Sequence, residues 1–361
     1  MRAETRAVPN AYPTIQAAID AAADGDVVLL KEGVYAGEGN RDVDFKGRKI
    51  TVKSETGHGG CIIDCRGLGR GFVFQNDEGP SSVLDGLTIV GGFTDASGGA
   101  IFCSRSSPTL VNLVLIGNRA RQNGGGIAIA GGGPRIGNTA LLGNVAAAGG
   151  GISFRGGDQT VVNCTFNENT SANGAAIYCE GGSLTLCNSI LWGDKARAQL
   201  SIGLNATVSV TCCTIHGGPA GVRGAERGGL FWGQGTIVMD PLFALPGGYH
   251  LQGDSASVDG GTNTPPGDLP ARDLDGGARS QDGDGDTVPR IDIGAAERSR
   301  VDPILAAAPV RLEFFGKEGG PNPYGEALSI ITPAAARSSG RSPKIAHGSR
   351  SSRRRAGRSG R

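Results

Sequence analysis

Apolar and polar positions repeat along the middle of this chain with a period of about 25 residues. The repeat is carried by four segments that align without gaps: NLVLIGN (112–118), NTALLGN (138–144), NCTFNEN (163–169) and NSILWGD (188–194). A Gly-rich motif keeps the same step and ends at Ile101, Ile127, Ile152 and Ile177. The register extends to GLTIVGG at 86–92 and to CCTIHGG at 212–218, so six turns share one pattern.

Within each turn the side chains alternate with period two, as they do in β-strands. The third residue after the first Asn is always apolar, which predicts an inward column: Leu115, Leu141, Phe166, Leu191 and Ile215. The residue directly after that Asn is smaller and lies on the same face: Leu113, Thr139, Cys164, Ser189 and Cys213. Short strands, Gly-rich corners and a constant inward column predict a parallel β-solenoid whose turns stack about 4.8 Å apart.

The first Asn of each repeat predicts a structural ladder at one corner of the solenoid. These residues are Asn112, Asn138, Asn163 and Asn188. An amide both donates and accepts, so each side chain can bond the next one along an internal column. We therefore assign them a structural role and no catalytic one.

The N-terminal segment predicts a cap for the open end of the solenoid, where strand edges would otherwise be exposed. In TIQAAIDAAADGD, Ile15, Ala18, Ile19 and Ala22 fall on one helical face, and Thr14 can cap the helix. VVLLKEGVY (27–35) and KITVKS (49–54) then predict the first strands.

Composition narrows the class of protein. The chain has 63 Gly in 361 residues and 38% hydrophobic residues, and no run approaches the roughly 20 apolar residues of a membrane-spanning helix. Residues 298–361 hold 13 Lys+Arg and 4 Asp+Glu, so this basic tail has a net charge of +9 and the rest of the chain −8. We expect a disordered tail, and no nucleic-acid partner for the mildly acidic body.

Eight cysteines are too few for a disulfide-stapled scaffold of this length. Cysteines that share a column lie two or three turns apart, beyond the usual disulfide reach of about 7 Å between Cα atoms. Buried free thiols are the expected state. The start, MRAETRAVPNAYPTIQ, shows no apolar stretch typical of a signal peptide.

Three stretches carry a family resemblance. YPTIQAAIDAAADGDVVLLKEGVY resembles the entry segment of right-handed parallel β-helix proteins of the pectate-lyase and pectinesterase fold. The GGAI and FNEN elements resemble the GGAI/FxxN repeats of polymorphic outer-membrane adhesins. The stretch from DPLFALPGGYHLQ to PRIDIGAAE is similar to the segment that closes many secreted bacterial β-helix repeat proteins. The resemblance covers about residues 12–297 and implies that the protein is exported. It does not imply one activity, because the fold hosts both enzymes and adhesins.

The predicted fold is all-β: a right-handed, single-stranded parallel β-helix of about seven to nine turns with an N-terminal helical cap. We expect the cap at 1–24 and the β-helix at 25–220. An irregular segment associated with the β-helix should follow at 221–297, and the basic tail at 298–361.

Enzymes of the fold that this chain resembles use paired carboxylates, or an Arg or Lys base with Ca²⁺. Gly57-His58-Gly59 matches part of a polygalacturonase-like site, but no Asp pair follows in register. Glu168 and Asp194 lie near one corner, and no two adjacent turns place Asp and Arg in one strand column. The sequence therefore holds no complete catalytic constellation, and whether the protein is an enzyme stays open.

One outward column offers a binding face instead: Val90, Ile116, Leu142, Asn167, Trp192 and His216. Trp192 and His216 beside Asn167 can stack on a sugar ring and hydrogen-bond to it, so we predict these three as binding residues. The alternative is that a loop or the C-terminal segment covers this apolar stripe. Phe102 and Tyr178 share another outward column but are separated by Ala128 and Ser153, and we interpret them as scattered surface aromatics.

Asp282, Asp284 and Asp286 alternate with glycines and predict a structural Ca²⁺ site, because alternate carboxylates can converge on one hard cation. The stretch departs from an EF-hand loop at Thr287 and Ile293, so a looser site is expected. Asp273, Asp275 and Asp292 can add ligands, and a solvated acidic loop is the alternative.

These observations favour a non-catalytic secreted or surface β-helix protein that binds carbohydrate or a cell-surface partner as a monomer. One alternative is a polysaccharide lyase or hydrolase, and another is a fragment of a larger adhesin. We expect no membrane span, and an extracellular or cell-surface location.

Overall fold

The structure is a computed structural model that describes residues 3–299 except 197, 228, 268 and 269, and two strands beyond them. It divides into two units, Met1–Asp302 and Pro303–Arg361. In the second unit, β26 (Ala306–Ala307) pairs antiparallel with β27 (Ile330–Ile331). The rest of the predicted basic tail, apart from residues 298–299, lies outside the described residues.

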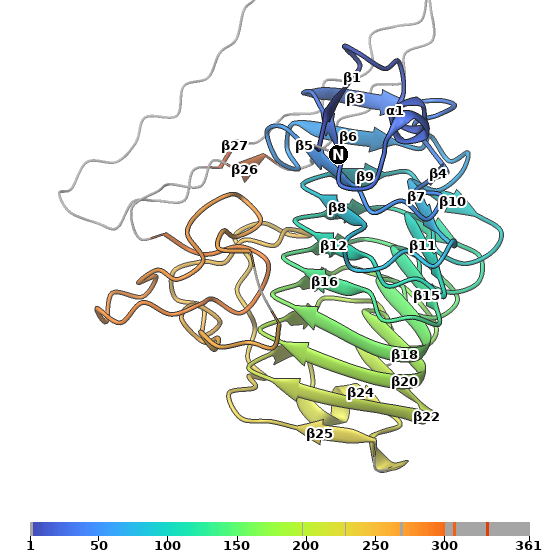
Figure 1. The fold of residues 1–361 in the computed structure, drawn as a ribbon. Helices are drawn as coiled ribbons and strands as arrows, with labels where there is room; N and C mark the ends of the chain where they lie inside the picture. The colour runs from blue at the N-terminus through green and yellow to red at the C-terminus, as the bar shows by residue number, and fades with distance from the viewer. Residues whose placement is uncertain are drawn as a thin grey trace, which may run out of the picture. The chain divides into compact units, whose positions relative to one another are not determined.

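Residues 5–232 form a parallel β-solenoid of about nine turns, which confirms the predicted fold class (Figure 1). Each turn passes through three faces in order. The first face holds β4 (Val43–Asp44), β7 (Phe72–Phe74), β11 (Ile101–Ser104), β15 (Ile127–Ala130) and β24 (Val222–Arg223). The second face holds β1 (Thr5–Val8), β2 (Val27–Leu30), β5 (Thr51–Ser54), β8 (Val83–Asp85), β12 (Thr109–Val111), β16 (Arg135–Gly137) and β25 (Leu230–Trp232).

Three long strands run through both of these faces and join them into one 15-stranded sheet: β18 (Ile152–Val162), β20 (Ile177–Cys187) and β22 (Leu200–Thr211). The third face is an eight-stranded sheet of β3 (Gly33–Ala36), β6 (Cys61–Asp64), β9 (Thr88–Val90), β13 (Val114–Ile116), β17 (Ala140–Leu142), β19 (Thr165–Asn167), β21 (Ile190–Trp192) and β23 (Thr214–Ile215). A short corner pair follows it, β10 (Phe93–Thr94) with β14 (Arg119–Ala120).

The strand register confirms the inward columns. Leu115 pairs with Leu141, Leu141 with Phe166, Phe166 with Leu191 and Leu191 with Ile215. All five side chains are fully buried. The smaller column beside them is also fully buried, and its polar members donate to the carbonyl two residues earlier, as Thr139 does to Gly137 and Ser189 to Cys187. Each buried hydroxyl is thus paired locally and disturbs no neighbouring turn.

The predicted Asn column lies at the sharp corner between the second and third faces. Asn112, Asn138, Asn163 and Asn188 all have positive φ values between 47° and 55°, a backbone state that Asn tolerates better than most residues. Nδ2 of Asn138 donates to Oδ1 of Asn112 at 3.0 Å, and Nδ2 of Asn163 donates to Oδ1 of Asn138 at 3.4 Å. The ladder begins one turn earlier, where Asn112 donates to Asp85 at 2.7 Å.

A second amide column, not singled out in the sequence, lies fully inside the coil. Asn118, Asn144 and Asn169 are fully buried, and each donates from Nδ2 to the residue one turn later at 2.9–3.0 Å. The column ends at the carboxylate of Asp194, which accepts from both the backbone N–H and Nδ2 of Asn169. These bonds hold the corner after the third face in register from turn to turn.

Among the described residues there is one α-helix, which lies between the first two strands of the coil. The helix α1 (Ile15–Ala21) begins after Thr14, whose hydroxyl accepts from the backbone N–H of Ala17 at 3.2 Å. Ile15, Ala18 and Ile19 are fully buried in the core of the solenoid. Two short 3₁₀ helices, η1 (Gly218–Gly221) and η2 (Ala225–Arg227), lie in the last turn. The capping role of α1 stays a prediction.

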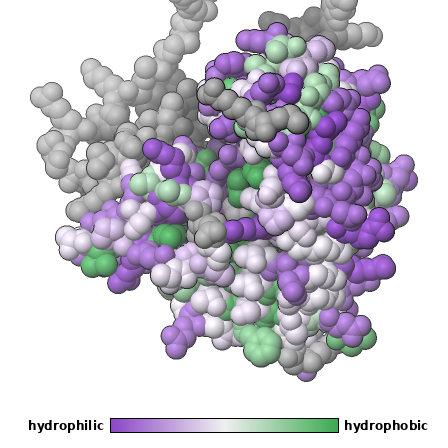
Figure 2. Space-filling model, in the orientation of Figure 1, coloured by the Kyte–Doolittle hydropathy of each residue, from purple (hydrophilic) through white to green (hydrophobic). Residues whose placement is uncertain are grey.

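Residues 238–299, the C-terminal segment, lie along one side of the coil (Figure 1). The described residues of the segment form turns and three isolated antiparallel bridges, such as Gln281 with Arg290. Figure 2 shows that the N-terminal turns are mostly hydrophilic on the face in view and that the later turns are paler. The 25-residue repeat does not describe this segment.

Candidate functional site

The predicted outward stripe forms a continuous column on the third face. Ile116 pairs with Val90 and Leu142, and Asn167 pairs with Leu142 and Trp192. His216 follows β23 directly and continues the column by ring contact, since its ring centroid lies 4.6 Å from that of Trp192. The sequence therefore placed these six residues on one stripe correctly.

The C-terminal segment covers most of this stripe. Leu142 packs in an apolar cluster with Leu274 and Ala295, and Ile116 and Tyr249 pack against that cluster. Further along, Leu251, Val258 and Ile293 pack on Ile190, with Trp192 at the margin of the cluster. A covered stripe was the alternative in the sequence analysis, and the structure shows it for the apolar part of the column.

Asn167 lies beneath the segment rather than at the surface. Its side chain is 3% exposed, and Nδ2 donates to the carbonyl of Gly248 at 2.9 Å. Trp192 is half-buried and His216 is exposed. Of the three predicted binding residues, the structure therefore presents only Trp192 and His216 to solvent, and their binding role stays a prediction.

A buried charge pair attaches the segment to the Asn ladder. Arg279 is 5% exposed; its Nη1 donates to Oε1 of Glu297 and its Nη2 donates to Oδ1 of Asn138, both at 2.5 Å. Burial acts to raise the pKa of Glu297, and the adjacent Arg279 guanidinium opposes this by favouring the charged carboxylate. Because Asn138 also donates to the carbonyl of Arg272 at 2.7 Å, one repeat residue fixes two parts of the segment.

A cluster of ionisable groups forms where the segment meets an early turn. Asp275 contacts His250 at 2.7 Å and His58 at 3.3 Å, and accepts a hydrogen bond from Tyr249 at 2.8 Å. The sequence noted His58 within Gly-His-Gly, but its partners lie about 190–220 residues later. The hydrogen bonds to both histidines and to Tyr249 hold the pKa of Asp275 well below its usual value, although burial opposes this. The four groups bond one another and attach the segment to the coil.

A separate hollow of about 480 Å³ opens on the first face. Its floor follows a column in which Phe102 pairs with Ala128, Ala128 with Ser153 and Ser153 with Tyr178. Phe102 lines one end, and Ala128 and Ser153 leave room because their side chains are small. Tyr178 lies one strand beyond Ser153, so the two rings are three strand spacings apart, about 14 Å at 4.8 Å per strand.

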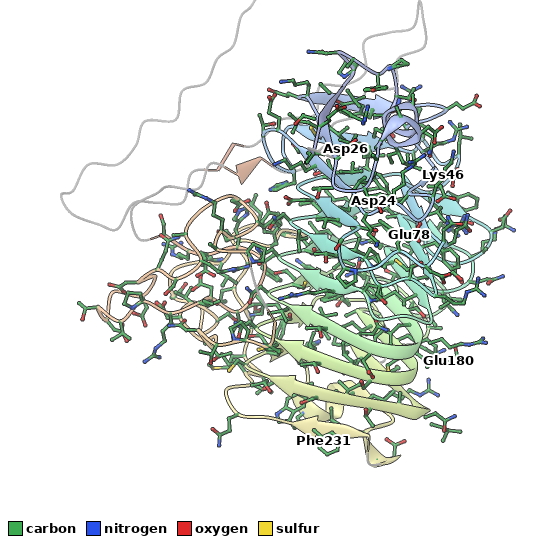
Figure 3. All side chains as sticks on the ribbon, viewed as in Figure 1. Asp24, Asp26, Lys46, Glu78, Glu180 and Phe231 are labelled. Atoms are coloured by element: carbon green, nitrogen blue, oxygen red, sulfur yellow. The ribbon has the colours of Figure 1, made fainter. Side chains whose placement is uncertain are left out.

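Polar side chains surround this hollow. Gln122, Asn123, Arg155 and Glu180 line it, with Ser97 at the end near Phe102. Arg155 and Glu180 are exposed, and Glu180, a residue of β20, projects from the edge of the coil (Figure 3). The guanidinium of Arg70 lies 5.4 Å from the ring centroid of Phe102 and so fixes the position of this ring. The hollow thus combines one aromatic ring with amide, hydroxyl and charged groups around a floor of small residues.

The predicted calcium ligands are only partly brought together. Side-chain oxygens of Asp282 and Asp284 lie within 4.8 Å of each other and of Asp259, a residue that the sequence analysis did not name. Asp286 accepts from the backbone N–H of Val288 at 2.7 Å. The three further residues that the sequence offered as ligands have other partners: Asp273 bonds to the backbone of Gly277, Asp275 to the two histidines, and Asp292 to the backbone of Asp259.

The Chlamydia polymorphic membrane protein (Chlamydia_PMP) repeat matches residues 163–180. This stretch lies within one turn of the solenoid: Phe166 lies in the inward column, Asn169 in the buried amide column, and Gly174 opens the Gly-rich motif. Gly174 has φ +55°, and a Cβ there would lie 2.0 Å from the carbonyl oxygen of Ile177. The matched motif therefore consists of residues that the stacking requires.

No curated protein and no solved structure gives a significant match to the chain. The repeat and the solenoid together fit an adhesin-like β-helix protein of the outer membrane or cell surface. Among the described residues, no helix is long and apolar enough to cross a membrane.

Proposed function

We propose that this protein is a non-catalytic surface or secreted solenoid that binds a carbohydrate chain in the hollow on its first face. The observation that carries the proposal is the hollow itself, in which Phe102 stands over a floor of Ala128 and Ser153. The apolar face of a sugar ring packs on an aromatic side chain, and its hydroxyl groups need donors and acceptors at the rim. Gln122, Asn123, Arg155 and Glu180 supply both.

The length of the column favours a chain over a single sugar. The lining residues come from four successive strands, from Phe102 in β11 to Glu180 in β20, and span about 14 Å along the axis of the coil, which is longer than one sugar ring. Arg155 and Glu180 bring one charge of each sign to the rim, so the hollow has no strong preference for an acidic glycan. The exposed pair of His216 and Trp192 is a second candidate face for the same function.

The test is a binding screen of the full chain on an array of neutral and acidic oligosaccharides, followed by titration of each hit. Replacing Phe102 with Ala should weaken binding at least tenfold, because the stacking surface is lost. Phe93→Ala is the matched control: Phe93 is also half-buried beside an arginine, with the Arg121 guanidinium 5.9 Å from its ring, but it does not line the hollow.

Each outcome separates the alternatives. If Trp192→Ala abolishes binding and Phe102→Ala leaves it unchanged, the binding site lies on the third face and not in the hollow. Equal losses in Phe102→Ala and Phe93→Ala contradict a specific role for the hollow. An assay for new reducing ends or unsaturated products accompanies each hit, and turnover would replace the proposal with a lyase or hydrolase.

A further inference from the structure

Three aspartates from two parts of the C-terminal segment meet at one place. Side-chain oxygens of Asp259, Asp282 and Asp284 all lie within 4.8 Å of one another. Asp282 and Asp284 belong to the Asp-Gly-Asp-Gly-Asp motif, whereas Asp259 precedes it by more than 20 residues and has no sequence signal of its own. The fold is what adds a third carboxylate to the pair.

Asp259 is buried with an incomplete set of partners. The residue is 5% exposed, and its Oδ2 accepts from the backbone N–H groups of Gly283 at 2.9 Å and Asp284 at 2.8 Å. These two bonds turn the carboxylate towards the Asp282–Asp284 turn. Its Oδ1 is buried and has no hydrogen-bond partner among the residues that the structure describes. A buried carboxylate oxygen without a partner is unfavourable, so this atom points to a ligand that the protein atoms do not supply.

We propose that Asp259, Asp282 and Asp284 bind one Ca²⁺ ion. The donors are all carboxylate oxygens, which suit a hard cation, and the group holds no imidazole or thiolate to favour zinc or copper. Calcium takes oxygen ligands at about 2.3–2.6 Å, so two ligands on opposite sides of one ion lie about 4.6–5.2 Å apart. All three carboxylates lie within 4.8 Å of one another, close enough to bind a single calcium ion.

The ion would join the two parts of the C-terminal segment that meet the coil. Val258, next to Asp259, packs with Ile190 in the layer over the third face. Three residues after Asp259, Thr262 donates from its backbone N–H to Oδ1 of Asn188 at 2.9 Å. Bound calcium offsets two of the three carboxylate charges and holds the turn at 282–284 against this docked stretch, so calcium stabilises the covered stripe.

The binding test is calorimetric titration of the full chain with CaCl₂ after removal of divalent ions. We expect one site, and affinity lowered at least tenfold in Asp259→Asn and in Asp284→Asn. Asp284 is exposed, so its replacement leaves the fold intact. Asp254→Asn and Asp286→Asn are the matched controls, because one lies nearby and the other in the motif, and both should bind within about twofold of the unchanged chain.

The second readout is the melting temperature with and without calcium. Saturating calcium should raise the Tm of the unchanged chain and of Asp254→Asn by several degrees, and that of Asp259→Asn by much less. Magnesium at the same concentration should give a smaller shift. Absence of binding heat and of any Tm shift up to about 10 mM calcium overturns the proposal. Binding to Asp259→Asn equal to that of the unchanged chain overturns it too.

Discussion

Asp194 ends the buried amide column inside the coil, where the earlier turns have asparagine. Asn169 donates to its Oδ1 twice, at 2.7 and 2.9 Å, while Oδ2 is buried with no hydrogen-bond partner in the described part of the chain. Burial raises the pKa of Asp194 to about 8, far above the usual 3.8. A carboxyl group replaces an amide at the one point of the ladder where the next turn supplies no continuation.

We predict that Asp194→Asn stabilises the protein. The folded-state pKa is raised, so the native state holds a proton that the unfolded state releases, and the unchanged chain loses stability as the pH rises from about 4 to 8. The variant avoids this loss, and its gain should be about 2 kcal/mol at pH 8 and close to zero at pH 4.

Urea unfolding between pH 4 and pH 8 measures the effect, and Asp77→Asn, at an exposed position, is the control. A gain in Asp194→Asn that does not change with pH would contradict the buried, protonated state of this carboxyl group.

At the scale of elements, the contact between the coil and the C-terminal segment is the least regular part of the molecule. The turns of the coil pair along every strand, whereas the segment is attached by a few polar anchors and two apolar clusters. Arg279 is the most connected anchor, since its two terminal nitrogens bond Glu297, Asn138 and the carbonyls of Gly294 and Ala295.

Replacing Arg279 with Met should loosen the segment and leave the coil intact. The change removes four hydrogen bonds and leaves the buried Glu297 without its cation, which typically costs about 3 kcal/mol. Hydrogen exchange should rise across residues 238–299 and stay unchanged in the inner strands at 101–215.

Arg272→Met is the control for this change. Arg272 is exposed, and its guanidinium donates to the carbonyl of Gly276, a residue of the same segment. Equal exchange profiles for the two variants would show that Arg279 is no anchor.

At the scale of the whole molecule, the burial of the cysteine side chains indicates how tightly the coil is packed. All eight are free in the structure, and seven of them are buried. Burial raises the pKa of Cys164 to about 12, and it raises those of Cys65, Cys179 and Cys187 to about the same value. Cys212 is the exception in burial, being only half-buried.

A thiol-reactive disulfide reagent should therefore find one reactive cysteine in the native protein and eight after unfolding. Cys212→Ser should remove the native reaction and leave seven thiols in denaturant. Two or more native thiols reacting at the rate of Cys212 would mean that the coil opens in solution.

The solenoid could be read from the sequence because nearly all of its contacts join residues one turn apart. Leu141 meets Leu115 and Phe166, and Asn138 meets Asn112, so the same 25-residue step that appears in the sequence appears in the strand register. The stripe from Val90 to His216 followed from the same step. In a repeat fold, the repeat length therefore predicts which residues are neighbours in adjacent turns.

The parts outside this period were decided by tertiary structure. Asn138 and Arg279 are 141 residues apart in the sequence, and Asn167 and Gly248 are 81 residues apart. No spacing rule joins the residues of either pair, so the sequence could not specify these two contacts. Asp259 joins Asp282 and Asp284 only because the segment folds back on itself. Phe102 looked isolated in the sequence, yet the small residues beside it are what open the hollow. The sequence by itself determined the strands and the repeat length, because both depend on residues that are close in the chain or one turn apart. Only the tertiary structure decided these sites, because they depend on where one irregular segment and a few small side chains lie in space.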